Sequence, residues 1–379
     1  MKRYRPALLA LAAVVAAGCR HDAEPGPPPG DLIAFTVTEN VARGCPGIWS
    51  VDGRGNLRWL AGDSATYPAF QHDGRLTVGF ASARDVLGVP LTDVVASESG
   101  ERLALGVYVL GFTWSPSRRQ LLALRPDSAG KSYSLVVIDA ATGRTTTVAE
   151  RAGASAWLGD GASIAYVAVR DGEESLWVAR ADGTGARLLA RSVERFAAAA
   201  DGRTIAFRRT AKERFSEDLW VVDVQTGEQR QVPGAPLSDR SWGDVWVGAR
   251  TLVVHDNLRG AGSREHDAIL VDVDSGERSL LARDAAVLEA SRDGSTLVAI
   301  REHLVGAEED VIAVLTMRAD GTDERLLAAT DVQNGNIHGI PVLQPAHREL
   351  GTYKVEPASE QRCRAELTAF RTMVDKQSP

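Results

Sequence analysis

Histidine and aspartate side chains are neighbours at two places in the chain where they could perform chemistry. "HDN" begins at His255 and "EHD" ends at Asp267, and these two groups flank one long loop. Imidazole and carboxylate groups can hold a metal ion or exchange protons when a loop brings them together. The other histidines are scattered, without the H-x-H or HExxH spacing of metal sites. We therefore predict no metal site and no catalytic residues.

Other marks of catalysis or cofactor binding are missing from the sequence. It contains no G-x-S-x-G, the motif that presents the nucleophile of α/β-hydrolases. No glycine-rich phosphate loop precedes a helix, so we predict no cofactor. The formal net charge of −7 argues against a nucleic-acid binder, because phosphate contacts require a basic face.

Three long, charged segments are the strongest candidates for a binding surface. They are "RRTAKERFSED" (208–218), "HDNLRGAGSREHD" (255–267) and "REHLVGAEED" (301–310). Eight of their basic residues, here called the basic rim, are Arg209, Lys212, Arg214, Arg259, Arg264, His266, Arg301 and His303. We expect this rim to bind an anionic group or the acidic tail of a protein partner. The alternative is three solvated loops.

The elements that must position these segments recur with a period of about 45 residues. Each repeat has two apolar stretches around a turn with a glycine, as in "VVIDAATGRTTTV" and "LWVARADGTGARLL". The seven turn glycines are Gly53, Gly100, Gly143, Gly183, Gly227, Gly276 and Gly321, so 268 positions cover six steps. A second hairpin, such as "AAADGRTIAFR", lies between successive glycines. Four strands in such a period are typical of one blade of a β-propeller.

The repeat resembles that of TolB-type, WD40-like β-propellers, whose hallmark is "SPDG..IAF" followed by "LWV.D..TG". The closest matches are "WSPSRRQLLAL" and "DGRTIAF" followed by "EDLWVVDVQTGE", and the resemblance covers nearly all of residues 31–345. It implies an all-β fold of four-stranded antiparallel blades. Seven glycines predict seven blades, with six or eight as alternatives.

The two ends of the repeat region are expected to meet. "DLIAFTVT" begins the first blade without an innermost strand before it, and the tail "IHGIPVLQPAHRELGTYKV" offers that strand. We therefore predict that the C-terminal part closes the ring, which removes exposed strand edges. A helix is predicted after it, around "SEQRCRAELTAFRTMVDK".

Aromatic residues also recur at the blade period. Trp49, Trp177 and Trp220 hold one place in the repeat, and Phe70, Trp114, Trp157 and Trp246 hold another. Because the repetition follows the blades, we predict that these rings pack one blade against the next; stacking on a sugar is the alternative.

The N-terminus is typical of an exported protein. Lys2, Arg3 and Arg5 precede the apolar run "ALLALAAVVAAG" and then Cys19, the pattern of a secretory signal peptide. A short, uncleaved membrane anchor is the alternative. The segment "AAGC" resembles the lipobox of bacterial lipoproteins, although Ala16 stands where leucine is usual. That resemblance implies lipidation of Cys19, and Arg20 after it favours the outer membrane.

Four regions follow from these patterns. They are a signal peptide (1–18), a Pro/Gly-rich tether (19–30), the propeller (31–355) and a helical tail (356–379). Two cysteines remain, Cys45 near the start of the propeller and Cys363 after its end. In an oxidising compartment we predict a disulfide between them, which would stabilise by about 4–5 kcal/mol in the chain-entropy model. Two unpaired thiols are the alternative.

The functional prediction is a binding or scaffold protein without enzymatic activity. The TolB resemblance implies a role in the cell envelope, with another envelope protein or a peptide as partner. We expect a monomer that meets the membrane only through its lipid and binds no nucleic acid. The alternative is a lyase or hydrolase that acts on saccharides or lactones at the mouth of the propeller channel.

Overall fold

The computed structural model describes most of the predicted propeller. The described residues are 32–37, 47–62, 65–71, 73–84, 90–97, 101–117, 119–128, 131–193, 195–210, 216–234, 237–238, 243–256, 267–291, 293–305, 309–331, 342–343, 361, 364–365 and 368. The predicted signal peptide, the tether and the three cysteines, Cys19, Cys45 and Cys363, lie outside these residues. The lipidation and the disulfide therefore stay predictions.

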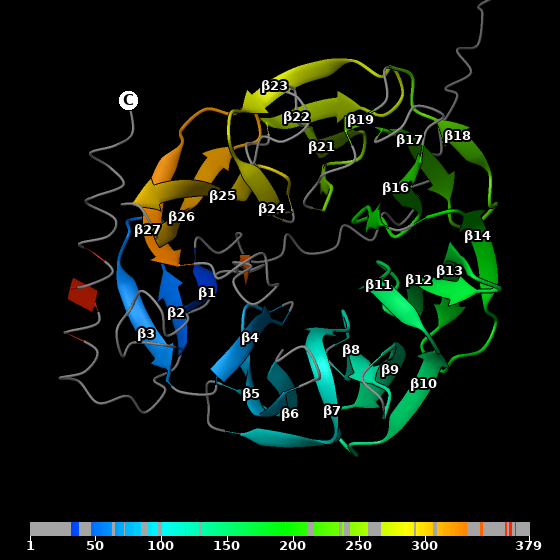
Figure 1. The fold of residues 1–379 in the computed structure, drawn as a ribbon, viewed down its shortest axis with the longest axis horizontal. Coiled ribbons are helices and arrows are strands. Elements are labelled where there is room, and N and C mark those ends of the chain that lie inside the picture. The colour runs from blue at the N-terminus through cyan, green and yellow to red at the C-terminus, as the bar shows by residue number, and fades with distance from the viewer. Residues whose placement is uncertain are drawn as a thin grey trace, which may run out of the picture.

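The strands form a closed ring of seven antiparallel blades within the described residues (Figure 1). Blade 1 contains β28 (Val342–Leu343), β1 (Ile33–Val37), β2 (Gly47–Val51) and β3 (Leu57–Ala61). Blade 2 contains β4 (Ala65–Phe70), β5 (Leu76–Arg84), β6 (Pro90–Ser97) and the first part of β7 (Arg102–Trp114). Blade 3 contains the rest of β7, β8 (Gln120–Pro126), β9 (Tyr133–Asp139) and β10 (Thr145–Ala149).

The remaining blades follow around the ring in chain order. Blade 4 contains β11 (Ala152–Trp157), β12 (Ser163–Arg170), β13 (Glu173–Arg180) and β14 (Arg187–Arg191). Blade 5 contains β15 (Phe196–Ala198), β16 (Thr204–Thr210), β17 (Ser216–Asp223) and β18 (Gln229–Gln231), and β19 (Leu237–Ser238) pairs with β17. Blade 6 contains β20 (Val245–Val247), β21 (Thr251–Asp256), β22 (Asp267–Asp272) and β23 (Arg278–Ala282). Blade 7 contains β24 (Ala286–Ala290), β25 (Thr296–Val305), β26 (Glu309–Arg318) and β27 (Arg325–Asp331).

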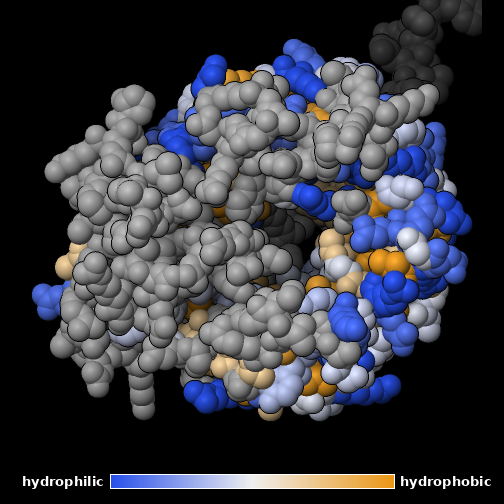
Figure 2. Space-filling view, viewed as in Figure 1, coloured by the Kyte–Doolittle hydropathy of each residue, from blue (hydrophilic) through white to orange (hydrophobic). Residues whose placement is uncertain are grey.

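The ring closes in blade 1, as predicted. Val342 and Leu343 of β28 pair with Ala34 and Ile33 of β1, so a strand from the C-terminal tail completes the first blade. Closure leaves the innermost strands around a central opening, and hydrophobic residues lie at its edge (Figure 2). The predicted helical tail is confirmed where it is described, because residues 361, 364, 365 and 368 are helical. None of the described helical residues belongs to a helix long and apolar enough to span a membrane.

The blades are held together by apolar faces that no single sheet could bury alone. At the seam between blades 7 and 1, Phe35 and Trp49 pack with Val298 and Val314, and all four are fully buried. This arrangement follows from the sequence, because the strands carry apolar residues on both faces.

The predicted packing of aromatic residues between blades is confirmed by their hydrogen bonds. The indole N–H of Trp114 donates to Thr77 Oγ1 of the preceding blade at 2.7 Å. The indole N–H of Trp246 likewise donates to the carbonyl of Ala197 at 2.9 Å. These rings therefore fix the angle between neighbouring blades as well as fill the space between them.

Most of the predicted turn glycines have the positive φ that a tight hairpin turn requires. Gly143, Gly183, Gly227, Gly276 and Gly321 have φ between +68° and +81°. The prediction is wrong for Gly53, because Gly55 is the residue with positive φ (82°) in that turn, and Gly100 lies outside the described residues. In "VDGRGN" the Gly55 N–H donates to the Asp52 carbonyl at 2.8 Å, which closes the turn two residues later than expected.

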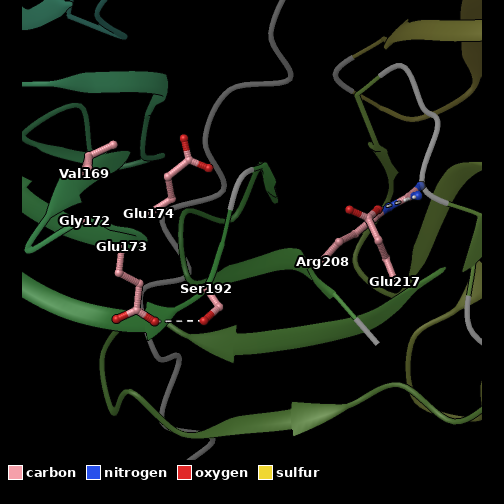
Figure 3. Close-up of a pocket in the computed structure, with 7 residues that line it drawn as sticks. All are labelled: Val169, Gly172, Glu173, Glu174, Ser192, Arg208 and Glu217. Atoms are coloured by element: carbon pink, nitrogen blue, oxygen red, sulfur yellow. Dashed lines mark hydrogen bonds and ion pairs between the residues drawn. The ribbon is translucent and has the colours of Figure 1, made fainter. Parts of the chain in front are cut away.

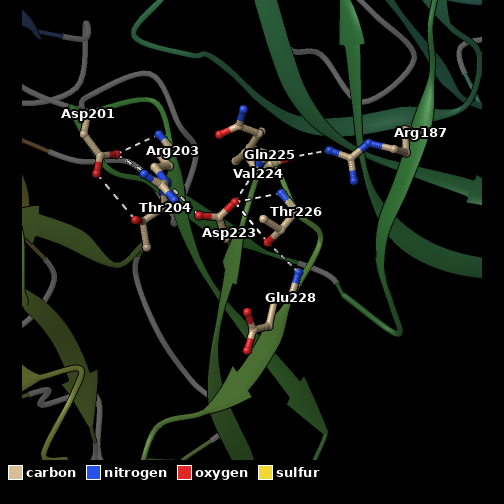
Figure 4. A network of polar contacts seen from close by, with 9 residues as sticks. All are labelled: Arg187, Asp201, Arg203, Thr204, Asp223, Val224, Gln225, Thr226 and Glu228. Atoms are coloured by element: carbon tan, nitrogen blue, oxygen red, sulfur yellow. Dashed lines mark hydrogen bonds and ion pairs between the residues drawn. The ribbon is translucent and has the colours of Figure 1, made fainter.

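An aspartate caps many of these turns, and Asp223 in blade 5 shows how (Figure 4). Its carboxylate accepts the backbone N–H of Thr226 at 2.8 Å and Nε–H of Arg203 at 2.7 Å. The Thr226 N–H, followed by the Arg203 side chain, lowers the pKa of Asp223 to about 2. Hydrogen bonds to the ionised form favour that form, so the cap depends on pH.

We expect acid to remove the stabilisation that Asp223 provides. A carboxyl whose pKa is 3.8 in the unfolded chain and about 2 when folded stabilises fully above pH 4. This contribution is lost as the pH falls from about 4 to about 2. The Asp223→Asn variant should therefore be less stable at pH 6 and should change less between pH 4 and pH 2, as measured by urea unfolding. The control is Asp93→Asn, whose carboxyl makes no hydrogen bond or ion pair with another described residue; an equal response would contradict the prediction.

Candidate functional site

The two basic-rim residues whose side chains are described are engaged within the fold. Arg209 donates from Nε to the Arg191 carbonyl at 3.1 Å and from Nη2 to Gln229 Oε1 at 2.7 Å. Its guanidinium also lies over the ring of Trp220, 4.7 Å from the centroid. Arg301 forms a bidentate ion pair with Glu324, with N–O distances of 2.7 and 2.9 Å. Arg209 thus links blade 5 to the outer strand of blade 4, and Arg301 is paired within blade 7.

The other rim residues do not add to this picture. Lys212, Arg214, Arg259, Arg264 and His266 lie outside the described residues. His303 is described only through its backbone in β25, which pairs with Val311. Arg209 lies in blade 5 and Arg301 in blade 7, so these two are not neighbours. Anion binding by the rim stays a prediction.

A cavity of about 460 Å³ lies between blades 4 and 5, on the side of the ring where second and third strands connect (Figure 3). We call this side the hairpin face and the opposite side the turn face. The cavity is lined by Val169, Gly172, Glu173, Glu174, Ser192, Arg208 and Glu217. Three of these residues are glutamates, and only one carries a positive charge.

The wall from blade 4 is built by a tight hairpin between β12 and β13. Asp171 and Gly172 have φ of 54° and 81°, as the two central residues of a type I′ turn require. This turn places Glu173 and Glu174 at the start of β13. Glu173 accepts the Ser192 hydroxyl at 2.8 Å and Arg191 Nη1 at 2.9 Å.

These contacts fix the charge of the wall. Hydrogen bonds from Ser192 and then from Arg191 lower the pKa of Glu173, so its carboxylate is ionised at neutral pH. The Glu174 side chain is exposed and forms no hydrogen bond or ion pair with another described residue. Glu174 is therefore the carboxylate of this wall that can meet a ligand.

The wall from blade 5 is built around Arg208, a charged residue in an apolar position. The position equivalent to Arg208 in the second strand is occupied by Val167 in blade 4 and by Ile300 in blade 7. Arg208 donates from Nε and Nη2 to Asp244 at 2.9 and 2.5 Å, and from Nη1 to Glu217 at 3.4 Å. Its Nη2 also donates to the His255 carbonyl at 3.4 Å.

This ion cluster is almost wholly removed from water. The side chains of Arg208, Asp244 and Glu217 are 3%, 7% and 11% exposed. Burial opposes the charged form of Arg208, but Asp244 and Glu217 outweigh it and raise the pKa of the guanidinium. The cluster joins blade 5 to the segment that enters blade 6.

The contacts favour binding over proton transfer. The Arg208 donors point to two carboxylates and a carbonyl, so its charge is already balanced within the protein. Glu173 is held in its ionised form by two donors. A ligand would meet carboxylate oxygens, which accept hydrogen bonds and attract positive charge.

The "HDN" and "EHD" groups lie on paired strands where they are described. Asp256 pairs with Asp267 across β21 and β22, and His255 pairs with Ala268. His255 is fully buried. Among the described residues, no three His, Cys, Asp or Glu side chains gather as a metal site would need.

Sequence reasoning found neither wall of this cavity. Glu173 and Glu174 follow the Asp171-Gly172 turn, which lies outside the segments predicted to form a binding surface. Arg208 begins the segment "RRTAKERFSED", but the predicted basic rim includes only later residues of this segment. A signal was available, since Val167 and Ile300 occupy this position in blades 4 and 7, although the polar His255 occupies it in blade 6.

Comparisons with known proteins identify the fold. No family model matches the chain, and no curated protein matches it. An oligogalacturonate lyase from Vibrio parahaemolyticus is similar in structure, with 10% identity, 70% of this chain and 82% of that chain covered, and a TM-score of 0.53. An oligogalacturonate lyase in complex with manganese has 12% identity, coverage of 72% and 88%, and a TM-score of 0.52. TolB from Acinetobacter baumannii has 14% identity, coverage of 75% and 68%, and a TM-score of 0.47.

These likenesses and the sheet order define the class of protein: the chain is a β-propeller. The predicted all-β fold and the predicted seven blades are confirmed in the described residues. Identities of 10–14% carry no substrate or partner from these structures to this chain.

Proposed function

We propose that this protein is a non-enzymatic binding propeller of the cell envelope that holds a partner protein or peptide on its hairpin face. The observation that carries the proposal is the cavity of about 460 Å³ between blades 4 and 5. Its size falls within the range of ligand sites, about 300–1,000 Å³. The signal-peptide pattern and the lipobox resemblance support an extracytoplasmic protein tethered through Cys19.

The lining of the cavity favours a partner with a positive charge. Glu174 is free to accept hydrogen bonds, whereas Arg208 has its donors engaged. An anionic group would meet three glutamates and gain little from the guanidinium. A lysine or arginine side chain of a partner would find carboxylate acceptors among the lining residues.

Cross-linking in intact envelopes, followed by mass spectrometry, tests this function. A photoreactive residue at Ser192, which lines the cavity, should capture one main partner. We expect Glu174→Lys to reduce that cross-link at least tenfold, because it places a cation at the mouth.

The matched control is Glu277→Lys, which makes the same charge change at an exposed residue of the turn face. It should leave the cross-link intact. Absence of any captured partner in the wild type, or an equal loss in both variants, would overturn the proposed function.

A further inference from the structure

His255 lies at the seam between blades 6 and 7, in the second strand of blade 6. The residue is fully buried. Its Nε2 accepts the backbone N–H of Val287, in the innermost strand of blade 7, at 2.9 Å. The ladder between β24 and β25 shifts register just after Val287, between this residue and Glu289. A side chain of one blade thus completes the backbone hydrogen bonding of the next.

This contact requires one protonation state of the ring. A nitrogen that accepts an N–H has its lone pair directed at that N–H, so Nε2 carries no proton in the folded protein. A proton on Nε2 would set two N–H groups against each other. It would also place a cation in a site shielded from water, and burial disfavours the charged form.

We propose that His255 makes the seam between blades 6 and 7 sensitive to acid. In the unfolded or locally opened chain, a histidine takes up a proton near pH 6.5. Because the closed seam excludes that proton, mild acid favours the open form. The inference does not depend on the identity of the proposed partner.

The charged groups around His255 include a cation, which opposes protonation of the ring, and carboxylates, which favour it. On the blade 5 side, Arg208 donates to the His255 carbonyl at 3.4 Å and so adds positive charge next to the residue. Asp244, which precedes β20, is engaged by Arg208 at 2.5 Å.

Four further carboxylates complete these surroundings. On β22, Asp267 accepts the Asp284 N–H at 3.1 Å and pairs in register with Asp256, while Asp272 lies at the far end of the strand. On β24, Glu289 lies two residues beyond Val287 and is half-buried. Asp267 is thus engaged with another donor, whereas the Val287 N–H donates to the His255 ring.

The test compares the pH dependence of unfolding in the whole mature chain between pH 8 and pH 5. Uptake of one proton raises the unfolding constant by up to about tenfold per pH unit below about pH 6.5. Gln offers an acceptor where Nε2 stands but does not titrate in this range, so His255→Gln should lower the slope of the logarithm of the constant by one proton. His255→Leu removes both the acceptor and the titration, so it should be less stable already at pH 8 and show the same reduced slope.

Two results would overturn the proposal. One is an unchanged slope in His255→Gln. The other can be measured by NMR in the wild type, even if the variants do not fold. It is a His255 ring that protonates near pH 6.5 in the folded protein, while the exchange of the Val287 amide, corrected for the intrinsic rate, does not become faster. The expected wild-type result is a ring that stays neutral below pH 6.5 and a Val287 amide whose protection falls with acid.

Discussion

Arg208→Ala is expected to lower the free energy of unfolding by about 3–5 kcal/mol, because it leaves buried carboxylates without their cation. Asp244 and Glu217 are 7% and 11% exposed, so water cannot replace the guanidinium. The loss should be visible in urea unfolding at pH 7. It should also alter the cavity, since Arg208 and Glu217 form its blade 5 wall.

Arg203→Ala is the matched control for this prediction. Arg203 pairs with Asp223 at 2.7 Å, but its side chain is 64% exposed. Exposed ion pairs contribute about 0–1 kcal/mol, so the control should lose far less than the buried variant. Equal losses would mean that burial of the Arg208 cluster has no energetic consequence.

A triple variant separates stability from binding at this cluster. Replacing a buried ion cluster with apolar residues of similar volume is often neutral or stabilising. Arg208→Met combined with Glu217→Leu and Asp244→Leu should therefore recover most of the stability that Arg208→Ala loses. Because the same change removes polar groups from the cavity, the cross-link to the partner should still be lost. A cross-link that persists in the triple variant would show that these polar groups do not contribute to binding.

The strand pattern of the ring was predictable because it depends on neighbours in sequence. "DGRTIAF" and "EDLWVVD" became β16 and β17 with the turns in the expected places. The closing strand β28 came from the tail segment that offered it. Alternating or continuous apolar residues and turn chemistry are local properties, so they can be read along the chain.

One boundary between blades was not foreseen. Strand β7 runs from Arg102 to Trp114, pairs first with β6 and then with β8, and joins blades 2 and 3 in one sheet. The four-strand repeat instead predicts two separate strands in this region, with a break between them. Gly106 and Gly111 have φ of 69° and 63°, which lets the strand change direction without a separate loop.

The cavity was beyond local sequence patterns for a different reason. Its walls come from Glu173 and Glu174 in one blade and from Arg208 and Glu217 in the next. Which side chains face each other across the cavity depends on the angle between neighbouring blades. The basic rim was inferred from charge alone, and charge did not reveal that Arg209 and Arg301 are engaged by groups within the ring.

The turn glycines of the repeat have a second role that positive φ does not explain. A Cβ on Gly276 would lie 2.0 Å from the carbonyl oxygen of Pro233 in the segment after blade 5. A Cβ on Gly321 would lie 2.6 Å from the carbonyl oxygen of Leu281 in blade 6. The turn between the third and fourth strands of one blade therefore packs against the preceding blade. The contact is either with the outer strand of that blade or with the segment that follows it.

Gly276→Ala is accordingly expected to destabilise more than Gly248→Ala, although the two backbones match. Their φ values are +75° and +76°, and a Cβ on Gly248 meets nothing within 4 Å. The left-handed conformation alone costs about 1–2 kcal/mol for alanine, and this is the loss expected at Gly248. At Gly276 the contact with a backbone oxygen adds about 1–3 kcal/mol, because two blades must move apart. Urea unfolding of the two variants measures the difference, and equal losses would show that backbone conformation alone selects glycine at the repeat.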